Sequence, residues 1–150
     1  MKINQAIKQD NFSSYGLKAT VNLMYTSNWL RDQLNDVYLE FDILFQHFNI
    51  LKIIKGQSPN PASPSYIKEV MVDKGCDLTR IVDKLVKLNY VVRSQNSLNR
   101  RIIEIKITQK GIEVADKIQD NINIKIKKTI ALSEDECNEL SNLLDKLRIG

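Results

Sequence analysis

The sequence has few of the residues that build metal and catalytic sites. His47 is the only histidine, which excludes a metal site built on a histidine pair and leaves little for acid–base catalysis. The two cysteines, Cys76 and Cys137, form neither a cluster with metal-ligand spacing nor a disulfide framework. No glycine-rich phosphate loop ending in Gly-Lys-Ser or Gly-Lys-Thr is present. We therefore expect a protein that is not an enzyme and that holds no metal or cofactor.

Long apolar runs are also missing. No stretch approaches the roughly 18 uninterrupted apolar residues of a membrane span, and no apolar run near the start leads to a small-residue cleavage site. Because 43% of the 150 residues are hydrophobic, the chain can still bury the core of one domain. We expect a single domain over residues 1–150, in the cytoplasm, with reduced thiols and no membrane partner.

Proline is scarce, and its positions divide the chain. All three prolines lie between Pro59 and Pro64, just after a helical pattern over residues 42–55. Further upstream, residues 13–37 carry apolar side chains at helical spacing on two faces. A helix that is apolar on both faces needs two partners, one of which can be its own domain.

After the prolines, the pattern predicts two helices separated by a turn. Ser63 and Pro64 suit the N-cap and the first position of a short helix that ends near Met71. A turn containing a glycine follows over residues 73–75. Residues 76–89 then have apolar side chains on one helical face and polar side chains on the other. The sequence therefore predicts a helix-turn-helix.

The apolar pattern next changes from the period of a helix to that of a strand. Residues 90–93 and 101–107 are β-branched runs, and the polar loop 94–100 between them is rich in asparagine, which is typical of a β-hairpin. Two further helices are indicated, one beginning near Thr108 and one at the Ser133 capping box. The expected fold class is mainly α with one small β-hairpin (α+β).

A helix-turn-helix followed by a two-stranded ribbon predicts a winged helix-turn-helix, in which the second helix enters the major groove of double-stranded DNA. We call residues 63–110 the reading head. It holds 10 basic and 5 acidic side chains, a net charge of +5, whereas the other 102 residues hold 12 basic and 13 acidic ones, a net charge of −1. An excess of positive charge on this motif is expected for a surface that binds DNA phosphates.

The motif sequences also resemble those of a known family. Residues 78–88, 90–93, 99–101 and 108–111 are similar to the recognition helix, the wing and the start of the next helix in the MarR family of bacterial transcriptional regulators. The matched segments are distributed over nearly the whole chain. Their order and spacing carry the resemblance more than any single motif.

The resemblance implies a homodimer that binds a pseudo-palindromic DNA operator. The helices within residues 1–40 and 112–150 of two subunits would interdigitate as dimerisation helices and present two winged helix-turn-helix parts, residues 63–110, to DNA. The family commonly acts as a repressor of transcription. A small phenolic or otherwise lipophilic ligand, the effector, would release such a repressor from its operator.

The predicted DNA contacts follow from this arrangement. Arg80 and Thr79 could touch base edges or merely coat a solvated helix face, whereas residues around the recognition helix would meet phosphates. Asp83 would pair with Lys87 one turn further along the helix. The predicted contacts are Ser63, Ser65, Lys68, Lys74, Cys76, Thr79, Arg80, Lys84, Arg93, Asn99, Arg100 and Arg101.

The wing departs from the family pattern at one position. The family usually carries Asp-x-Arg there, and the carboxylate orders the arginine that reaches into the minor groove. Asn99 replaces that aspartate, and its hydrogen bond to Arg101 lacks charge assistance, which makes it roughly half as strong. We expect a looser wing tip, with Arg100 or Arg101 still in an A·T-rich minor groove.

Two alternatives stay open for several residues and for the function of the chain. One group of side chains could line a ligand cavity between the dimer helices and the reading head, or simply pack in the core: Tyr15, Met24, Trp29, Phe45 and His47. Cys76 could be a redox sensor or a small residue that faces the turn or the DNA, and Cys137 is expected in the core. The alternative function is a winged-helix protein-interaction module without operator-specific DNA binding.

Overall fold

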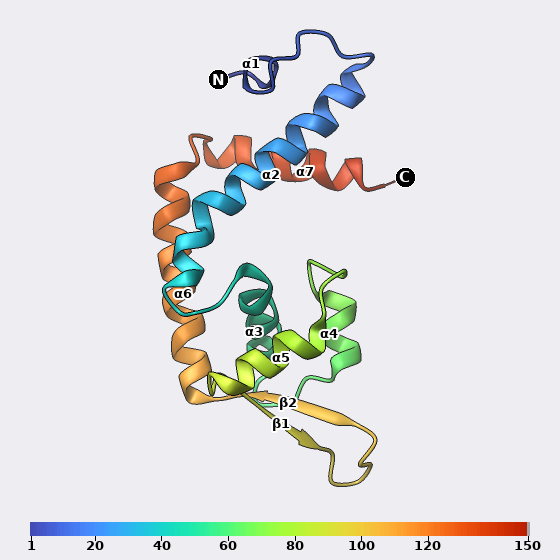
Figure 1. The fold of residues 1–150 in the computed structure, drawn as a ribbon, viewed down its shortest axis with the longest axis vertical. Coiled ribbons are helices and arrows are strands. Elements are labelled where there is room, and N and C mark those ends of the chain that lie inside the picture. The colour runs from blue at the N-terminus through green and yellow to red at the C-terminus, as the bar shows by residue number, and fades with distance from the viewer. Residues whose placement is uncertain (150) are drawn as a thin grey trace.

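Helices account for most of the computed structural model, which describes residues 1–149 (Figure 1). The expected class, mainly α with one β-hairpin, is confirmed. Gly150, the last residue of the predicted dimerisation segment, lies outside the described residues. In chain order the elements are α1 (Ile3–Ala6), α2 (Tyr15–Leu39), α3 (Phe45–Gln57), α4 (Pro64–Val70), α5 (Leu78–Lys87), β1 (Val91–Gln95), β2 (Ile103–Ile107), α6 (Gln109–Thr129) and α7 (Glu134–Leu147).

Short polar side chains determine where several helices begin. Each accepts a hydrogen bond from a backbone N–H in the first turn, which satisfies a donor that the helix itself leaves unpaired. The caps are Ser14 on α2, Ser63 on α4, Asp77 on α5, Thr108 on α6 and Ser133 on α7. The recognition helix therefore begins at Leu78, two residues after the predicted start, because Asp77 is its cap.

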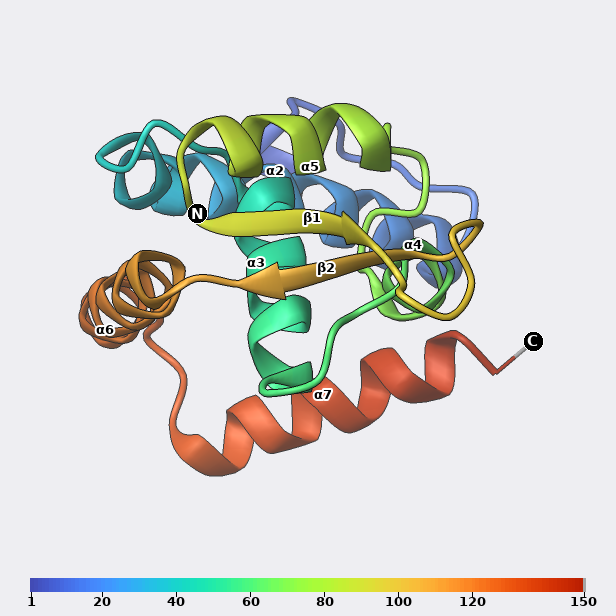
Figure 2. The ribbon, with the colours of Figure 1, turned by 90° about the horizontal axis from the view of Figure 1, so that it is seen from below.

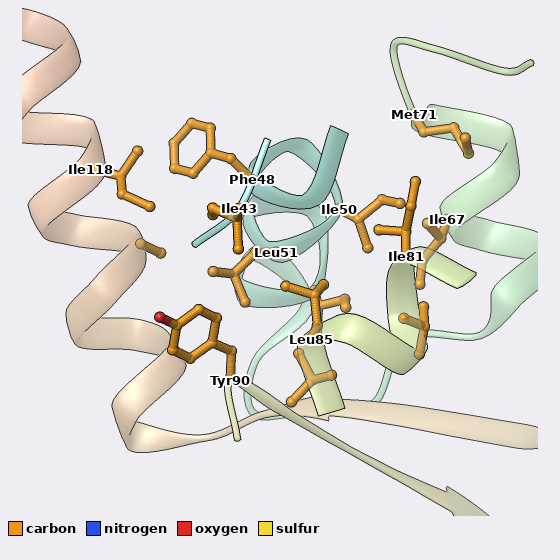
Figure 3. Close-up of a cluster of buried hydrophobic side chains, with 14 of the residues drawn as sticks. Ile43, Phe48, Ile50, Leu51, Ile67, Met71, Ile81, Leu85, Tyr90 and Ile118 are labelled. Carbon is orange, nitrogen blue, oxygen red and sulfur yellow. The ribbon is translucent and has the colours of Figure 1, made fainter. Parts of the chain in front are cut away.

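The apolar core is built around α3. Its buried side chains Ile50, Leu51 and Ile54 are at most 1% exposed, and α4, α5, β2 and α6 all contact this helix. Figure 3 shows Leu85 of α5 and Ile118 of α6 pointing toward it from different sides. Burial of these aliphatic side chains holds the helix-turn-helix, the hairpin and α6 together as one unit.

The hairpin is antiparallel, with Val91 opposite Ile107 and Gln95 opposite Ile103. The loop between the strands covers residues 96–102, two residues later than predicted, because the ladder continues to Gln95. Ala62 adds an isolated bridge to β2, in which its N–H and C=O both bond Ile105 at 2.9 Å. This bridge anchors the start of the reading head to the hairpin.

Gly111, in the first turn of α6, lets that helix pack closely against the start of β1. A Cβ at this position would collide with the carbonyl oxygen of Tyr90 and would lie 2.9 Å from Cγ1 of Ile107. Only a residue without a side chain fits there. The glycine therefore sets the position of the hairpin relative to α6.

The two ends of the chain contribute little to this core. We call residues 4–36 and 123–149 the arms, because none of these residues is buried. They extend away from the hairpin end of the molecule (Figure 1). The expectation that Cys137 lies in the core is wrong, because α7 contains no buried residue and this thiol is only half-buried. Within residues 1–149, no helix is long and apolar enough to cross a membrane.

Candidate nucleic-acid interface

The second helix of the helix-turn-helix, α5, has one face in the core and one in solvent. Leu78, Ile81, Val82 and Leu85 form the buried face. The opposite side lies on the outside of the molecule, next to the hairpin (Figure 2). The predicted DNA contacts all lie on or beside α4 and α5, in the turn between them, or on the hairpin.

Arg80 and Thr79 are on the exposed side of the first turn of α5. The backbone N–H of Arg80 donates to the capping carboxylate of Asp77, but its guanidinium forms no ion pair within residues 1–149. A free guanidinium at this place can donate two parallel hydrogen bonds to a base edge or a phosphate.

The N-terminal end of α4 presents a second polar group of predicted contacts. The hydroxyl of Ser63 accepts the N–H of Tyr66 as the helix cap and lies 2.9 Å from the hydroxyl of Ser65. Ser65 and Lys68 are exposed on the same short helix. Ser63 thus has a structural task in its own helix, whereas Ser65 and Lys68 are available to phosphates.

The turn between α4 and α5 is held in place from α3. The side-chain oxygen of Asn49 accepts the N–H of Val72 at 3.0 Å, and the carboxylate of Asp73 accepts the N–H of Gly75 at 3.1 Å. Lys74 donates to the carbonyl of Glu69 at 3.1 Å. The local sequence pattern does not predict the hydrogen bond from Val72 to Asn49, because these residues are 23 positions apart.

Lys84 and Arg93, both predicted DNA contacts, pair with carboxylates of the chain itself. Lys84 bonds Asp42 in the segment between α2 and α3, and this ammonium holds the pKa of the Asp42 carboxyl below its usual value. Arg93 on β1 lies 2.7 Å from Asp83 on α5. The predicted pairing of Asp83 with Lys87 is wrong, because β1 brings the arginine of the wing within reach.

The loop of the hairpin is organised by two asparagine side chains. Asn96 accepts the backbone N–H groups of Leu98 and Asn99, both at 2.9 Å, and Asn99 accepts the backbone N–H of Arg101 at 3.1 Å. Asn99 therefore orders the loop backbone rather than the guanidinium of the arginine. Arg100 and Arg101 are exposed. The looser wing tip stays a prediction.

Cys76 lies in the turn just before α5, and its surroundings disfavour a reactive thiolate. The thiol donates to the carbonyl of Asp73 at 3.1 Å. Burial raises the pKa of this thiol, and the nearby carboxylates of Asp73 and Asp77 raise it further. The positive end of α5 is already capped by Asp77. The structure thus favours the interpretation of Cys76 as a small structural residue over a redox sensor.

A cleft of about 460 Å³ separates α2 from the helix-turn-helix, a volume typical of small-molecule sites. It is lined by Leu30, Leu34 and Tyr38 of α2, by Phe45 of α3 and by Val72 of the turn, with four polar residues: Ser27, Arg31, Gln46 and Asp73. Apolar walls with a few polar groups suit a small amphipathic molecule.

The other predicted ligand residues lie elsewhere. His47 lines a different surface hollow, of about 530 Å³, beside α5, and Tyr15 lies in a third hollow near the start of α2. Met24 and Trp29 are on the exposed surface of α2, 63% and 41% exposed. Of the predicted set, only Phe45 therefore lines this cleft.

Known proteins with a similar sequence or fold are transcription regulators. No family model matches the sequence. MgrA of Staphylococcus aureus, an HTH-type transcriptional regulator, is 24% identical over 136 residues, which cover 91% of this chain and 85% of MgrA. A MarR-like transcription regulator from Bacillus cereus has a TM-score of 0.77 at 19% identity, covering 89% of this chain and 95% of its own.

A mutant of MarR from E. coli, solved in complex with operator DNA, is 27% identical with a TM-score of 0.71. The match covers 92% of this chain and 99% of the E. coli protein. In both sequence and fold, the chain is therefore similar to MarR-type transcription regulators. The winged helix-turn-helix matches that of these relatives, which are transcription regulators, and indicates a MarR-type transcription regulator that binds DNA.

Proposed function

We propose that this MarR-type regulator is a homodimeric repressor that binds a pseudo-palindromic operator in double-stranded DNA. The observation that carries the proposal is the placement of α5, which is fixed to the core by four buried side chains and turns Thr79 and Arg80 to solvent. It lies in the reading head, whose net charge is +5, whereas the other 102 residues together carry −1. The DNA complex of the E. coli relative supports this assignment.

The side chains divide into three roles. Arg80 reads base edges in the major groove, and Thr79 lies beside it. Ser65, Lys68 and Lys74 bind phosphates and set the orientation of the head without reading sequence. A third group holds the surface in shape through contacts within the chain: Ser63, Cys76, Lys84, Arg93 and Asn99.

The arms, at either end of the proposed 1–150 domain, account for the homodimer. Within the proposed dimerisation segments, 1–40 and 112–150, Leu23 and Met24 of α2 and Leu140 and Leu143 of α7 are 38% to 63% exposed in the single chain. A second copy of the chain would cover them. Two copies related by a twofold axis would place their α5 helices about 34 to 36 Å apart, one turn of DNA.

The cleft between α2 and the helix-turn-helix is where we place the effector, a small phenolic or otherwise lipophilic molecule. Phe45 and Tyr38 provide aromatic walls, and Val72 connects the cleft to the turn before α5. Because Val72 is also bonded to Asn49, an occupant of the cleft would act on the turn that positions the recognition helix. Binding there would shift α5 and release the protein from its operator, in the cytoplasm.

Selection of bound fragments from the native genome tests the proposal. The selected fragment is then titrated against a scrambled duplex of equal length at physiological salt, and we expect a preference of about a thousandfold. Arg80→Ala should lower that preference. Lys68→Ala is the matched control, since it should weaken binding to both duplexes alike and reduce the slope of log affinity against log salt by about one. Equal binding to both duplexes by the wild-type protein contradicts the proposal.

The alternative, a protein-interaction module, makes an opposite prediction for the wing. Reversing the charge of Arg100 and Arg101 to glutamate should abolish operator binding and regulation in the cell if the wing binds DNA. Intact regulation by this double variant would favour a protein partner instead.

A further inference from the structure

The wing tip carries an apolar side chain in a place where the chain itself gives it no contact. Leu98 is 96% exposed, more than any other large hydrophobic residue between 1 and 149. A leucine exposed to this extent lacks the favourable free energy that burial of its side chain would provide, and no contact within the single chain provides it. A contact outside the chain would do so.

The loop holds this side chain outward by hydrogen bonds of its backbone. The N–H of Leu98 itself donates to the side chain of Asn96, and the N–H of Asn96 donates to the carbonyl of Ile102 at 2.9 Å. The side chain of Asn96 also donates to Glu104 on β2, which fixes the asparagine to the strand. Leu98 is therefore presented on a folded loop rather than on an unstructured tip.

The charge around Leu98 suits a DNA groove. Arg100 and Arg101 follow directly and are exposed, and residues 94–102 contain no acidic side chain. Such a surface is attracted to phosphates on both sides of a groove. Leucine itself cannot bond a phosphate, so its partner has to be an apolar surface that lies between phosphates. In duplex DNA, the sugar walls and the base edges of the minor groove offer such a surface.

We infer that Leu98 is an apolar minor-groove contact that makes this wing selective for A·T pairs in the flanks of its site. The inference rests on the proposed function. The guanine N2 amino group protrudes into the minor groove, whereas A·T pairs leave the floor free. A leucine pressed against that amino group would take its donor out of water without providing an acceptor, which is unfavourable. In addition to the contacts of the arginines, Leu98 thus favours A·T pairs through the shape and solvation of the minor-groove floor.

The test uses three duplexes of the selected fragment that differ only in the flanking pairs covered by the wing. These pairs are A·T, inosine·C or G·C. An inosine·C pair lacks the N2 amino group, so it matches A·T in the minor groove and G·C in the major groove. The wild-type protein should bind the A·T and inosine·C duplexes alike and the G·C duplex about tenfold more weakly.

Leu98→Ala should bind the A·T and inosine·C duplexes about tenfold more weakly than the wild type, because burying half of a leucine side chain is worth about that factor. Its discrimination against G·C should fall to about threefold or less. Val92→Thr is the matched control: Val92 is 52% exposed on the same hairpin but away from the tip, and the change should leave affinity and discrimination unaltered. The melting temperature of both variants should equal that of the wild type.

Two outcomes overturn the inference while leaving operator binding intact. One is a Leu98→Ala variant with wild-type affinity and discrimination, which is also the result expected if Leu98 contacts a protein. The other is an equal loss on all three duplexes, which would show that Leu98 acts on the conformation of the wing and not on the groove. A wild-type protein that prefers none of the duplexes over scrambled DNA removes the proposed function, and this inference with it.

Discussion

The middle of the chain and the two arms differ in how much of their apolar surface is buried within a single chain. Every buried side chain except that of Ile3 lies between Val37 and Ile122, in the part that contains the helix-turn-helix and the hairpin. The arms expose leucines at helical spacing, such as Leu140, Leu143 and Leu147, and bury none of them. The reading head and the helices packed on it bury a core of their own, whereas the apolar side chains of the arms stay exposed in the single chain.

The charges follow the same division. The surplus of basic side chains lies in the reading head, and the rest of the chain is nearly neutral at −1. A neutral, apolar surface favours association of two copies, and a basic one favours an anionic partner.

Gly111→Ala should have the largest effect, because the new Cβ would collide with the Tyr90 carbonyl and with Ile107. We expect a loss of about 3 kcal/mol or more in the free energy of unfolding, measured by urea titration. Gly56→Ala is the matched control, since no atom lies within 4 Å of its Cβ position. In α3 it should be neutral or stabilising by up to about 1 kcal/mol. A stable Gly111→Ala protein would refute the close packing of α6 on β1.

A pair of leucine substitutions compares the head with the arms directly. Leu85→Ala removes a fully buried side chain and should lower the free energy of unfolding by about 2 to 5 kcal/mol at any protein concentration. Leu143→Ala, in α7, removes one that is 56% exposed. It should instead raise the dimer dissociation constant, measured by sedimentation, and shift unfolding only where the dimer dissociates. Similar effects of both changes on a monomer would contradict the division.

The helix caps repeat this comparison on a smaller scale. Asp77→Ala removes the cap of α5 and should cost about 1 kcal/mol of head stability in urea titration. Ser133→Ala removes the capping box of α7, where a similar local cost should show as weaker dimerisation. Should Ser133→Ala destabilise the head as much as Asp77→Ala does, α7 would belong to the same cooperative unit.

The smallest effect concerns pH. Burial lowers the pKa of His47 below 6.5, the ordinary histidine value, and the nearby Lys84 lowers it further. As the pH falls through 6.5, the unfolded chain therefore takes up a proton that the folded chain does not. The free energy of unfolding should fall between pH 7 and 5, and His47→Gln should reduce this dependence. An unchanged slope in the variant would mean that another group titrates.

Much of the head could be predicted from the sequence because its determinants are local. The cap at Ser63, the apolar face of α5 and the alternation in β2 are all determined by neighbouring residues. The predicted start of α5 was two residues too early because Asp77 is its cap, and the predicted hairpin loop was two residues too early because the ladder continues to Gln95.

The remainder depends on contacts between distant segments. The pairing of Lys84 with Asp42 and the bridge of Ala62 to Ile105 each join residues more than 40 positions apart, which no helical or strand period predicts. Arg93 and Asp83 meet because the hairpin folds back beside α5. The cleft beside Phe45 likewise forms only once α2 and the turn are placed. Sequence patterns locate helices and strands, whereas tertiary packing determines which charged side chains pair and where clefts form.

If two reading heads joined by the arms bind DNA together, the spacing of the two half-sites must match the dimer. The affinity of the protein for its selected operator is measured before and after insertion of about five base pairs between the half-sites. Half a helical turn moves one half-site to the opposite side of the duplex, so we expect affinity to fall by about a hundredfold. Unchanged affinity after the insertion would show that the two heads do not bind as a pair.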